Sequence, residues 1–338
     1  MAGTVLVTGG SGYIGGEIIR QLLAKGWTVH TTVRNLDSEA RVRPLLGGSA
    51  ETLKFFAANL TDDAGWAEAA AGCTHVCHVA SPLPAEPPRH ENDLIVPARD
   101  GALRALKAAK AAGAQRFVMT SSVAAIGYGH GKAKSRFTED DWTDVDGPGV
   151  QAYAKSKTIA EGSARDWVAT EGDGMEFATV NPALVLGPLA SADFSTSIEA
   201  MKQLMTGALP GCPNFGFGIV DVRDVADLHV RVLEAPGMKD ERFICSGPFL
   251  WMIDIARILK AELGPEARKV PLRRLPDFVV RIAALFNPVV RQVIGELGSR
   301  RDMDASHARD VLGWEPRPVR DTIVDTARSL IDLGIVKV

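Results

Sequence analysis

The apolar residues in the first half of the chain alternate between two periods. Short β-branched and apolar runs are separated by segments with helical spacing; the runs include TVLVTG, WTVHTTVR, LKFFAANL, HVCHVAS and RFVMTSS, and the helical segments include GGEIIRQLLAKG and ARDGALRALKAAKAAG. Strands that alternate with helices in this way are typical of βαβ units. The pattern therefore predicts an α/β fold built on a doubly wound parallel sheet.

The regular alternation weakens after residue 182. We expect one domain over residues 1–182, to which residues 219–245 return, and a smaller lobe over most of 183–338. A sheet of this kind binds its ligands at the carboxyl ends of the strands. We therefore expect the smaller lobe to face that edge and to help bind a substrate.

Individual elements follow from the same pattern. We predict a strand over 176–187, a strand followed by a helix over 218–237, and an amphipathic helix over 275–295 packed against the body of the protein. The segments 83–91 and 127–149 are rich in turn residues and are expected to form loops above the carboxyl edge.

The first strand leads into a glycine-rich turn and then a helix, in the order VLVTGGSGYIGGEIIRQLLAKG. Gly9, Gly12 and Gly15 have the spacing GxxGxxG. Glycine permits positive φ there and lets backbone amides and the helix N-terminus approach a pyrophosphate. A purely structural tight turn is the alternative, but the strand before and the helix after favour a Rossmann dinucleotide-binding domain.

The end of the second strand, HTTVRNLDSEAR, bears on the choice of cofactor. An acidic residue at this place would bind the ribose hydroxyls of NAD, whereas arginine suits a 2′-phosphate. Arg34 occupies the place and Arg41 follows one loop later, while Asp37 is the competing feature. The two guanidiniums favour NADP(H).

Tyr153 and Lys157 lie four residues apart in QAYAKSKTIAEG, so a helix would place them on one face. Alone, the pair could be the polar edge of an amphipathic helix. A lysine ammonium at about 4 Å would stabilise a phenolate by about 4 kcal/mol in a medium of dielectric constant about 20, or roughly three pKa units. The preceding phosphate-binding turn favours this second interpretation, in which Lys157 tunes Tyr153 for proton transfer.

Several strings together resemble one family. TGGSGYIG is similar to the cofactor loop, YAKSK to the catalytic YxxxK pair, and RFVMTSSVAAIG to the catalytic serine strand of the extended short-chain dehydrogenases/reductases. TVRN, HVASP, TVNPALVLGP and DVRDVADLHV resemble its dihydroflavonol 4-reductase and aldehyde/ketone reductase branch. The resemblance spans nearly the whole chain.

The resemblance implies a set of site residues. It makes Ser122, Tyr153 and Lys157 catalytic, and Tyr153 and Lys157 would also contact the cofactor. The other implied cofactor contacts are Gly9, Gly12, Tyr13, Ile14 and Gly15 at the pyrophosphate, Arg34 and Arg41 at the 2′-phosphate, Asn59 and Leu60 at the adenine, Val79, Ala80 and Ser81 along the ribose, Thr120 on the serine strand, Pro182, Ala183 and Val185 at the nicotinamide, and Ser197 at a phosphate. The family usually has aspartate where Asn59 stands, which alters the expected hydrogen bond to adenine.

These residues predict an NADPH-dependent reductase of an aldehyde or ketone, reversible as an alcohol dehydrogenase. Hydride would come from the nicotinamide and the proton from Tyr153. A nucleotide-sugar epimerase or dehydratase and a non-catalytic NADP-binding sensor of the same fold are the alternatives. We expect an apolar or aromatic-accepting substrate pocket, with candidate lining residues Tyr128, Trp142, Leu184, Phe194, Phe215 and Phe217.

Composition narrows the possible partners. Of the 338 residues 46% are hydrophobic and 23% charged, and the net charge of −3 gives no basic footprint for nucleic acid. No run is long and apolar enough to suggest a membrane span, and the N-terminus enters a strand at once, which leaves no room for a signal peptide. Together with four scattered cysteines, this favours a reduced, cytoplasmic setting.

The string CTHVCHVA gathers Cys73, His75, Cys77 and His78, but strand alternation would split them between two faces, so we expect no metal site. The helix over 98–112 and the helix after Tyr153 could pair with their copies in a homodimer, which many extended relatives form.

Overall fold

The computed structural model describes residues 3–82, 88–131, 134–192, 196–286, 290–291 and 294–337. Its centre is a seven-stranded sheet in the order β10-β7-β5-β4-β1-β2-β3, with every neighbouring pair parallel. The strands are β1 (Thr4–Val7), β2 (Thr28–Val33), β3 (Leu53–Ala57), β4 (His75–His78), β5 (Arg116–Thr120), β7 (Glu176–Pro182) and β10 (Glu241–Cys245). The predicted doubly wound α/β fold is confirmed.

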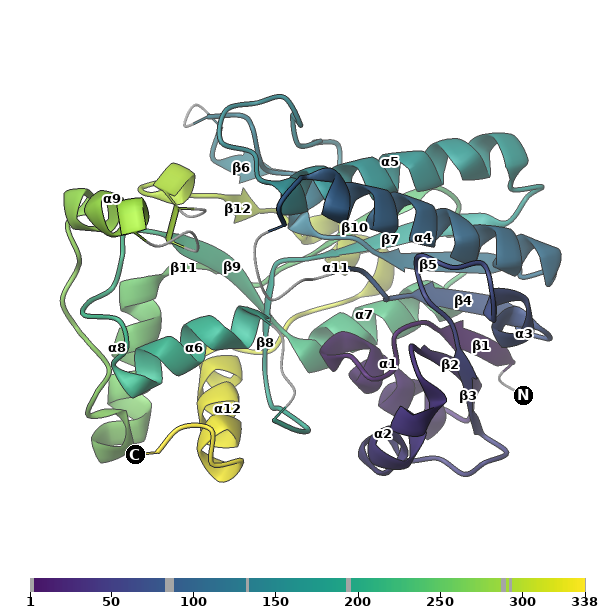
Figure 1. The fold of residues 1–338 in the computed structure, drawn as a ribbon, viewed down its shortest axis with the longest axis horizontal. Helices are drawn as coiled ribbons and strands as arrows, with labels where there is room; N and C mark the ends of the chain where they lie inside the picture. The colour runs from purple at the N-terminus through teal and green to yellow at the C-terminus, as the bar shows by residue number, and fades with distance from the viewer. Residues whose placement is uncertain are drawn as a thin grey trace.

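Helices cover both faces of this sheet (Figure 1). One layer holds α3 (Trp66–Ala70), α4 (Asn92–Ala111) and α5 (Ala152–Glu171); the other holds α1 (Tyr13–Ala24), α2 (Glu39–Leu46), α7 (Val222–Glu234) and α11 (Ser306–Leu312). Successive residues of a strand point to opposite faces of the sheet. Val5 and Val7 therefore pack in the core under α1 and α7, whereas Leu6 packs in the core under α4. Burial on both faces explains why these strands are continuously apolar.

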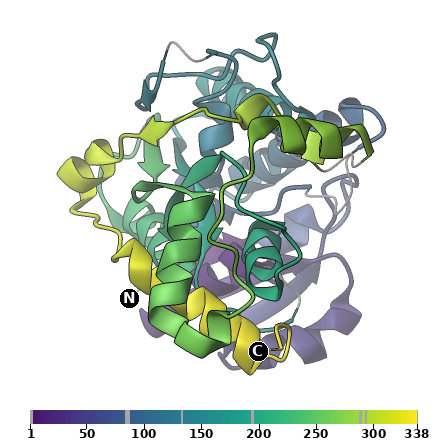
Figure 2. The same ribbon diagram turned by 90° about the vertical axis from the view of Figure 1, so that its left-hand side faces the viewer.

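A smaller lobe is built on a second sheet, in the order β11-β9-β8. It comprises β8 (Leu184–Leu186), β9 (Gly216–Asp221), β11 (Phe249–Trp251), α6 (Thr196–Thr206), α8 (Met252–Leu263) and α12 (Val319–Asp332). Leu204, Leu259 and Leu330 share its apolar core, and α8 and α12 pack against each other (Figure 2). Of the segment 219–245, α7 and β10 lie with the large sheet, whereas β9 belongs to this second sheet.

The structure divides the strand predicted over 176–187. The Ala183 amide donates to the Cys245 carbonyl oxygen at 3.0 Å, which ends β7 beside β10, and β8 then pairs with β9 in the other sheet. Helix α4 begins at Asn92, six residues before the predicted start, and the predicted strand over 75–81 ends at His78.

The segment 127–149, predicted as a loop, contains a short strand. β6 (Arg136–Phe137) pairs in parallel with β12 (Asp302–Met303) from the far end of the chain. The Asp302 amide donates to the Ser135 carbonyl oxygen at 2.7 Å and the Asp304 amide to the Phe137 carbonyl oxygen at 2.9 Å. The C-terminal segment therefore supports the loop that follows β5.

The helix predicted over 275–295 is less covered than expected in the part that the structure describes as α9 (Asp277–Phe286). This helix lies at the outer edge of the lobe (Figures 1 and 2) and buries Val280 and Ala284, one turn apart. Its larger apolar side chains, including Ile282 and Phe286, are exposed. The rest of the predicted helix includes residues that lie outside the described ranges. No helix in the described ranges has the length and apolarity needed to cross a membrane.

Candidate active site

The glycine turn between β1 and α1 is as tightly packed as its spacing requires. Gly9 has φ +73°, and a Cβ there would lie 3.1 Å from the Ala80 Cα. A Cβ on Gly15 would lie 2.5 Å from the Gly9 carbonyl oxygen. Only glycine fits these two positions, because one needs positive φ and the other a close backbone approach.

The N-terminus of α1 has no side-chain cap. Gly12 is the N-cap residue, and no side chain in the described part of the chain caps the first turn, which begins with Tyr13 and Ile14. Such amides attract an anion, and the field of the helix dipole adds to the attraction. The cradle therefore fits a dinucleotide pyrophosphate. The Tyr13 phenol itself packs inside the protein, where burial raises its pKa and its hydroxyl has no hydrogen-bond partner among the described residues.

The neighbouring strand end is fixed to this turn by Thr8. Its hydroxyl oxygen accepts from the amides of Val79 and Ala80 at 3.0 and 2.9 Å, so its proton is left to donate to His78 Nδ1 at 3.1 Å. These bonds end β4 and place Val79, Ala80 and Ser81 beside the glycine turn. This lies at the switch point between β1 and β4, where doubly wound sheets bind dinucleotides.

The predicted adenosine contacts lie at the ends of β2 and β3. Arg34 and Arg41 are both exposed, Arg34 just after β2 and Arg41 in α2. Asp37, the competing acid, accepts from Asn35 Nδ2 at 3.0 Å. After β3, Asn59 is exposed with its side chain accepting from the Thr61 amide, and Leu60 packs against Gly101 of α4.

The three predicted catalytic residues meet at the carboxyl edge. Ser122 follows β5, accepts from the Ala124 amide at 3.1 Å and donates to the Pro182 carbonyl oxygen at 3.4 Å. Tyr153 lies in the first turn of α5, near enough for the Ser122 hydroxyl to act on the pKa of its phenol. Burial of the phenol raises this pKa and the Ser122 hydroxyl lowers it, with a net upward shift. Residues 31 positions apart in the chain are thus brought together.

Lys157 is bonded to the end of the serine strand. Its ammonium donates to the Thr120 carbonyl oxygen at 3.2 Å. Burial lowers the pKa of Lys157 to about 8, opposed by the Glu161 carboxylate. The predicted tuning of the Tyr153 phenol by Lys157 stays a prediction.

The serine strand alternates as expected but uses Thr120 differently. The Thr120 hydroxyl is 2.7 Å from His229 Nε2 of α7, whereas Ser121 donates to Glu161 of α5 on the opposite face. His229 Nδ1 donates to the Val225 carbonyl oxygen, so Nε2 accepts the Thr120 proton. The Thr120 side chain is thus engaged beneath the site, and only its carbonyl oxygen reaches a catalytic residue.

The predicted nicotinamide contacts line the exit of β7. Pro182 is its last residue, Ala183 follows, and Val185 is buried in β8. Ser197 lies further along, in the first turn of α6.

Some predicted pocket residues lie close to the catalytic pair and others do not. Tyr128 lies near enough to Tyr153 for the two to influence each other electrostatically, and burial raises the pKa of Tyr128 to about 12. The Arg301 guanidinium is centred 4.3 Å above the Tyr128 ring. Phe215 and Phe217 pack edge to face within the core of the smaller lobe, joined there by Leu184, while Phe194 falls outside the described residues.

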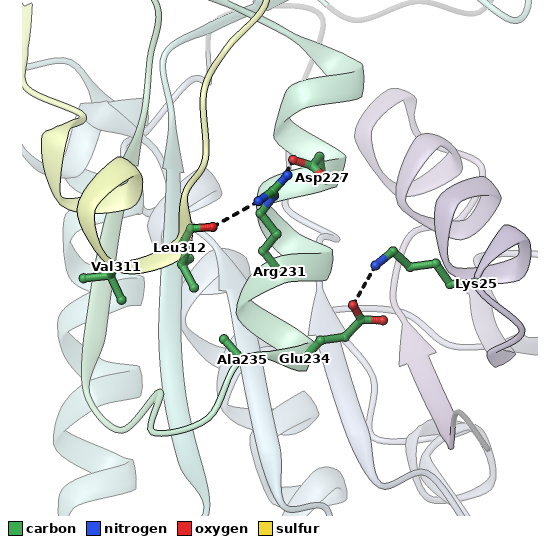
Figure 3. A pocket seen from close by; sticks show the side chains of 7 residues that line it. All are labelled: Lys25, Asp227, Arg231, Glu234, Ala235, Val311 and Leu312. Atoms are coloured by element: carbon green, nitrogen blue, oxygen red, sulfur yellow. Dashed lines mark hydrogen bonds and ion pairs between the residues drawn. The ribbon is translucent and has the colours of Figure 1, made fainter.

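A shallow depression elsewhere on the surface contains none of the predicted site residues (Figure 3). It is lined by paired charges, with Lys25 bonded to Glu234 and Arg231 to Asp227, each at 2.7 Å. It lies by the C-terminal end of α7, at the amino edge of the sheet. The cysteine and histidine string does not converge either, because Cys73 contacts His30 and Cys77 packs in the opposite apolar layer.

Sequence reasoning missed the polar residues that hold the catalytic ones. Glu161 accepts from Ser121, Asn181 and Arg242, and all four side chains are buried. The four-residue spacing from Lys157 to Glu161 could have shown that Glu161 lies on the same face of the helix. Asn181 and Arg242 lie on β7 and β10, and no local pattern connects them to Glu161.

A doubly wound sheet with a glycine-lined cradle and a serine, tyrosine and lysine at its carboxyl edge defines an oxidoreductase of the short-chain type. The chain belongs to the NAD dependent epimerase/dehydratase family, whose model matches residues 5–244. The predicted membership of the extended short-chain dehydrogenases/reductases is confirmed.

Two curated relatives are reductases. A cinnamoyl-CoA reductase of Medicago truncatula is 37% identical over 241 residues, which cover 69% of this chain and 73% of the relative. A dihydroflavonol 4-reductase of Zea mays is 32% identical over 270 residues, with coverages of 76% and 74%. The fold resembles that of yeast methylglyoxal/isovaleraldehyde reductase in complex with NADPH, with a TM-score of 0.81, 24% identity and coverage of 99% of this chain and 100% of that one.

Proposed function

We propose that this protein is an NADPH-dependent reductase of an aldehyde or ketone, reversible as an alcohol dehydrogenase. The observation that carries the proposal is the convergence of Ser122 after β5 with Tyr153 and Lys157 of α5, where the Lys157 ammonium bonds the Thr120 carbonyl oxygen at the end of β5. NADPH, when bound, supplies the hydride. Its pyrophosphate would lie on the amides of the glycine turn, and Arg34 with Arg41 would bind its 2′-phosphate.

The chain's own residues supply the proton and the orientation. Ser122 donates a hydrogen bond to the carbonyl oxygen and stabilises the charge that develops there. Tyr153 donates the proton to that oxygen, and its raised pKa keeps the phenol protonated beforehand. Lys157 adds a positive charge nearby and would bind the nicotinamide ribose.

The substrate is a small carbonyl compound with an apolar or aromatic body. Tyr128 beside Tyr153 and the ring of Trp142 near the end of the same loop support this class. The test mixes purified protein with NADPH and a panel of aliphatic and aromatic aldehydes and ketones while the absorbance of the reduced nicotinamide is followed. We expect oxidation with at least one aromatic member. Tight NADP binding without turnover of any member would favour the sensor alternative, and turnover of a nucleotide sugar alone would favour the epimerase.

A further inference from the structure

The face of α5 that carries Tyr153 and Lys157 continues one turn further to Glu161, which has no exposed surface. Its carboxylate accepts from four side chains, which come from four segments of the chain. These are Ser121 after β5, Asn181 of β7 at 2.9 Å, Arg242 Nε of β10 at 2.7 Å, and Arg165 Nε of α5 at 3.3 Å. A buried carboxylate with so many donors is held as an anion in one orientation.

One path leads from Glu161 to the catalytic serine. The Asn181 amide nitrogen donates to Glu161 and also to the Ser122 carbonyl oxygen, at 3.2 Å. Ser121, the residue before the catalytic serine, donates to the same carboxylate. The backbone on both sides of the Ser121–Ser122 peptide is therefore anchored to one buried charge.

A second path leads from Glu161 to the loop above the site. The Arg242 guanidinium donates to the carbonyl oxygens of Ala125 at 3.1 Å, Glu139 at 2.8 Å and Asp141 at 2.5 Å. Its centre lies 3.9 Å above the ring of Trp142. Ala125 ends the short turn that starts at Ser122, so a single planar side chain joins that turn, the loop and Glu161.

Lys157 and Glu161 act on each other's charge inside the protein. Burial lowers the pKa of Lys157 and Glu161 raises it, while burial raises the pKa of Glu161 and Arg242 and Arg165 bring it below its usual value. From β4, His78 faces Lys157, and burial lowers its pKa to about 3, so it is neutral there. Glu139 faces Arg242 from the loop. Glu161 is thus the only anion among the described groups that act on the pKa of Lys157.

We propose that Glu161 and Arg242 are positioning residues of the reductase: Glu161 holds Ser122 in place and keeps Lys157 cationic, and Arg242 fixes the Trp142 loop over the substrate. The proposal rests on the proposed function. It assigns the two residues separable roles, because only Glu161 acts on the charge of Lys157, and only Arg242 contacts the loop.

The first test is Glu161→Gln, which keeps the shape and removes the charge. Without the anion, Lys157 loses its proton more readily. We expect kcat to fall at least tenfold and the alkaline limb of the kcat profile to move to lower pH by about one unit. Glu176→Gln is the matched control, since it disrupts an equally buried arginine partner, Arg116, at the opposite edge of the sheet. It should lower Tm without moving the profile.

The second test is Arg242→Lys, which keeps the charge and loses the planar fork. We expect the KM for the carbonyl substrate to rise about tenfold while the alkaline limb stays in place, because several carbonyl oxygens lose their donor. This variant also tests the proposal if Glu161→Gln does not fold.

The failures are distinguishable. If the wild type reduces no carbonyl, the proposed function is wrong. If the wild type is active but the Glu161→Gln profile coincides with it, or Glu176→Gln shifts the limb equally, Glu161 has no electrostatic role. An unchanged KM in Arg242→Lys would remove Arg242 from substrate positioning.

Discussion

Two buried arginines pair with glutamates at opposite edges of the same sheet. At the amino edge, Arg116 of β5 faces Glu176 of β7 in direct register, and its guanidinium also donates to the carbonyl oxygens of Val232, Leu233 and Ala235 at the end of α7. At the carboxyl edge, Arg242 pairs with Glu161. The residue types, the burial of the arginines and the use of backbone carbonyl acceptors are alike, although Glu176 is partly exposed and Glu161 is not.

The difference lies in what the partners are connected to. The carbonyl oxygens bonded by Arg116 end a helix, beside the depression of Figure 3, and lead to no residue of the catalytic set. Those bonded by Arg242 belong to the turn after Ser122 and to the loop above it. A buried ion pair is thus weak evidence of either stability or function by itself; its edge of the sheet indicates which it serves.

The largest expected effect tests the chemistry of the carboxyl edge. Tyr153→Phe removes the proton donor and leaves the ring in place, so kcat should fall by about 10²–10⁴-fold. Tm and NADPH affinity should stay near those of the wild type, because phenylalanine keeps the ring and the glycine turn is untouched. Steady-state kinetics and fluorescence titration with NADPH measure both. Substantial remaining turnover would mean that another group donates the proton.

At the amino edge the expected effect is on stability alone. Arg116→Met removes the partner of Glu176 and the donor at the end of α7, which should lower the free energy of unfolding by about 3 kcal/mol. The kcat of the folded fraction should not change. Urea denaturation followed by assays at low temperature separates the two. A loss of kcat with normal stability would contradict the assignment of the Arg116–Glu176 pair to stability alone.

A pH effect sharpens the comparison, because α7 also contributes His229 beneath the carboxyl edge. Burial lowers the pKa of His229 to about 4, so the unfolded chain binds a proton that the folded protein excludes between about pH 6.5 and 4. Stability is complete above this window and is lost as the pH falls through it. The contribution of His229 between pH 7 and 5 is about 2 kcal/mol.

His229→Gln should therefore be less stable than the wild type at pH 7 but lose about 2 kcal/mol less on going to pH 5. The exposed His90→Gln serves as the control and should keep the wild-type dependence. Denaturation curves at both pH values give the result. Equal slopes in all three proteins would exclude a neutral buried His229.

The smallest expected effect concerns cofactor choice. Arg34→Ala should raise the KM for NADPH about tenfold and leave that for NADH nearly unchanged, because only NADPH carries the 2′-phosphate. The control is Lys54→Ala, at an exposed basic residue of the neighbouring strand β3. It should change neither the KM for NADPH nor the KM for NADH. Equal increases for the two cofactors would contradict the assignment of Arg34.

Local patterns in the sequence were sufficient for much of the fold and for choosing three residues that the fold brings together. The strand–turn–helix context of Gly9 and the four-residue spacing of Tyr153 and Lys157 are short-range features. The division at Ala183 was not predictable, since a bond to Cys245 of another strand decides it. Nor was the exposed side of α9, whose apolar pattern is that of a buried helix.

Most of the residues that hold the site in place could not be predicted from the sequence. Thr120 follows the correct alternation, but its partner His229 lies 109 positions away. Arg242 is 81 positions from Glu161 and reads as an ordinary strand arginine. A local sequence pattern can identify the residues that are candidates for the chemistry. The residues that hold these candidates in place come from distant parts of the chain and are known only from the tertiary structure.

The pairing of β6 with β12 has a consequence for redesign. Arg301, just before β12, donates to the Gly127 carbonyl oxygen and covers the Tyr128 ring, so residues 127–128 and 136–137 pack on residues 301–303. A substrate loop that replaces this one without the matching C-terminal segment would lose the contacts that β12 and Arg301 make with it. The two segments form one exchangeable module, although more than 160 residues separate them in the gene.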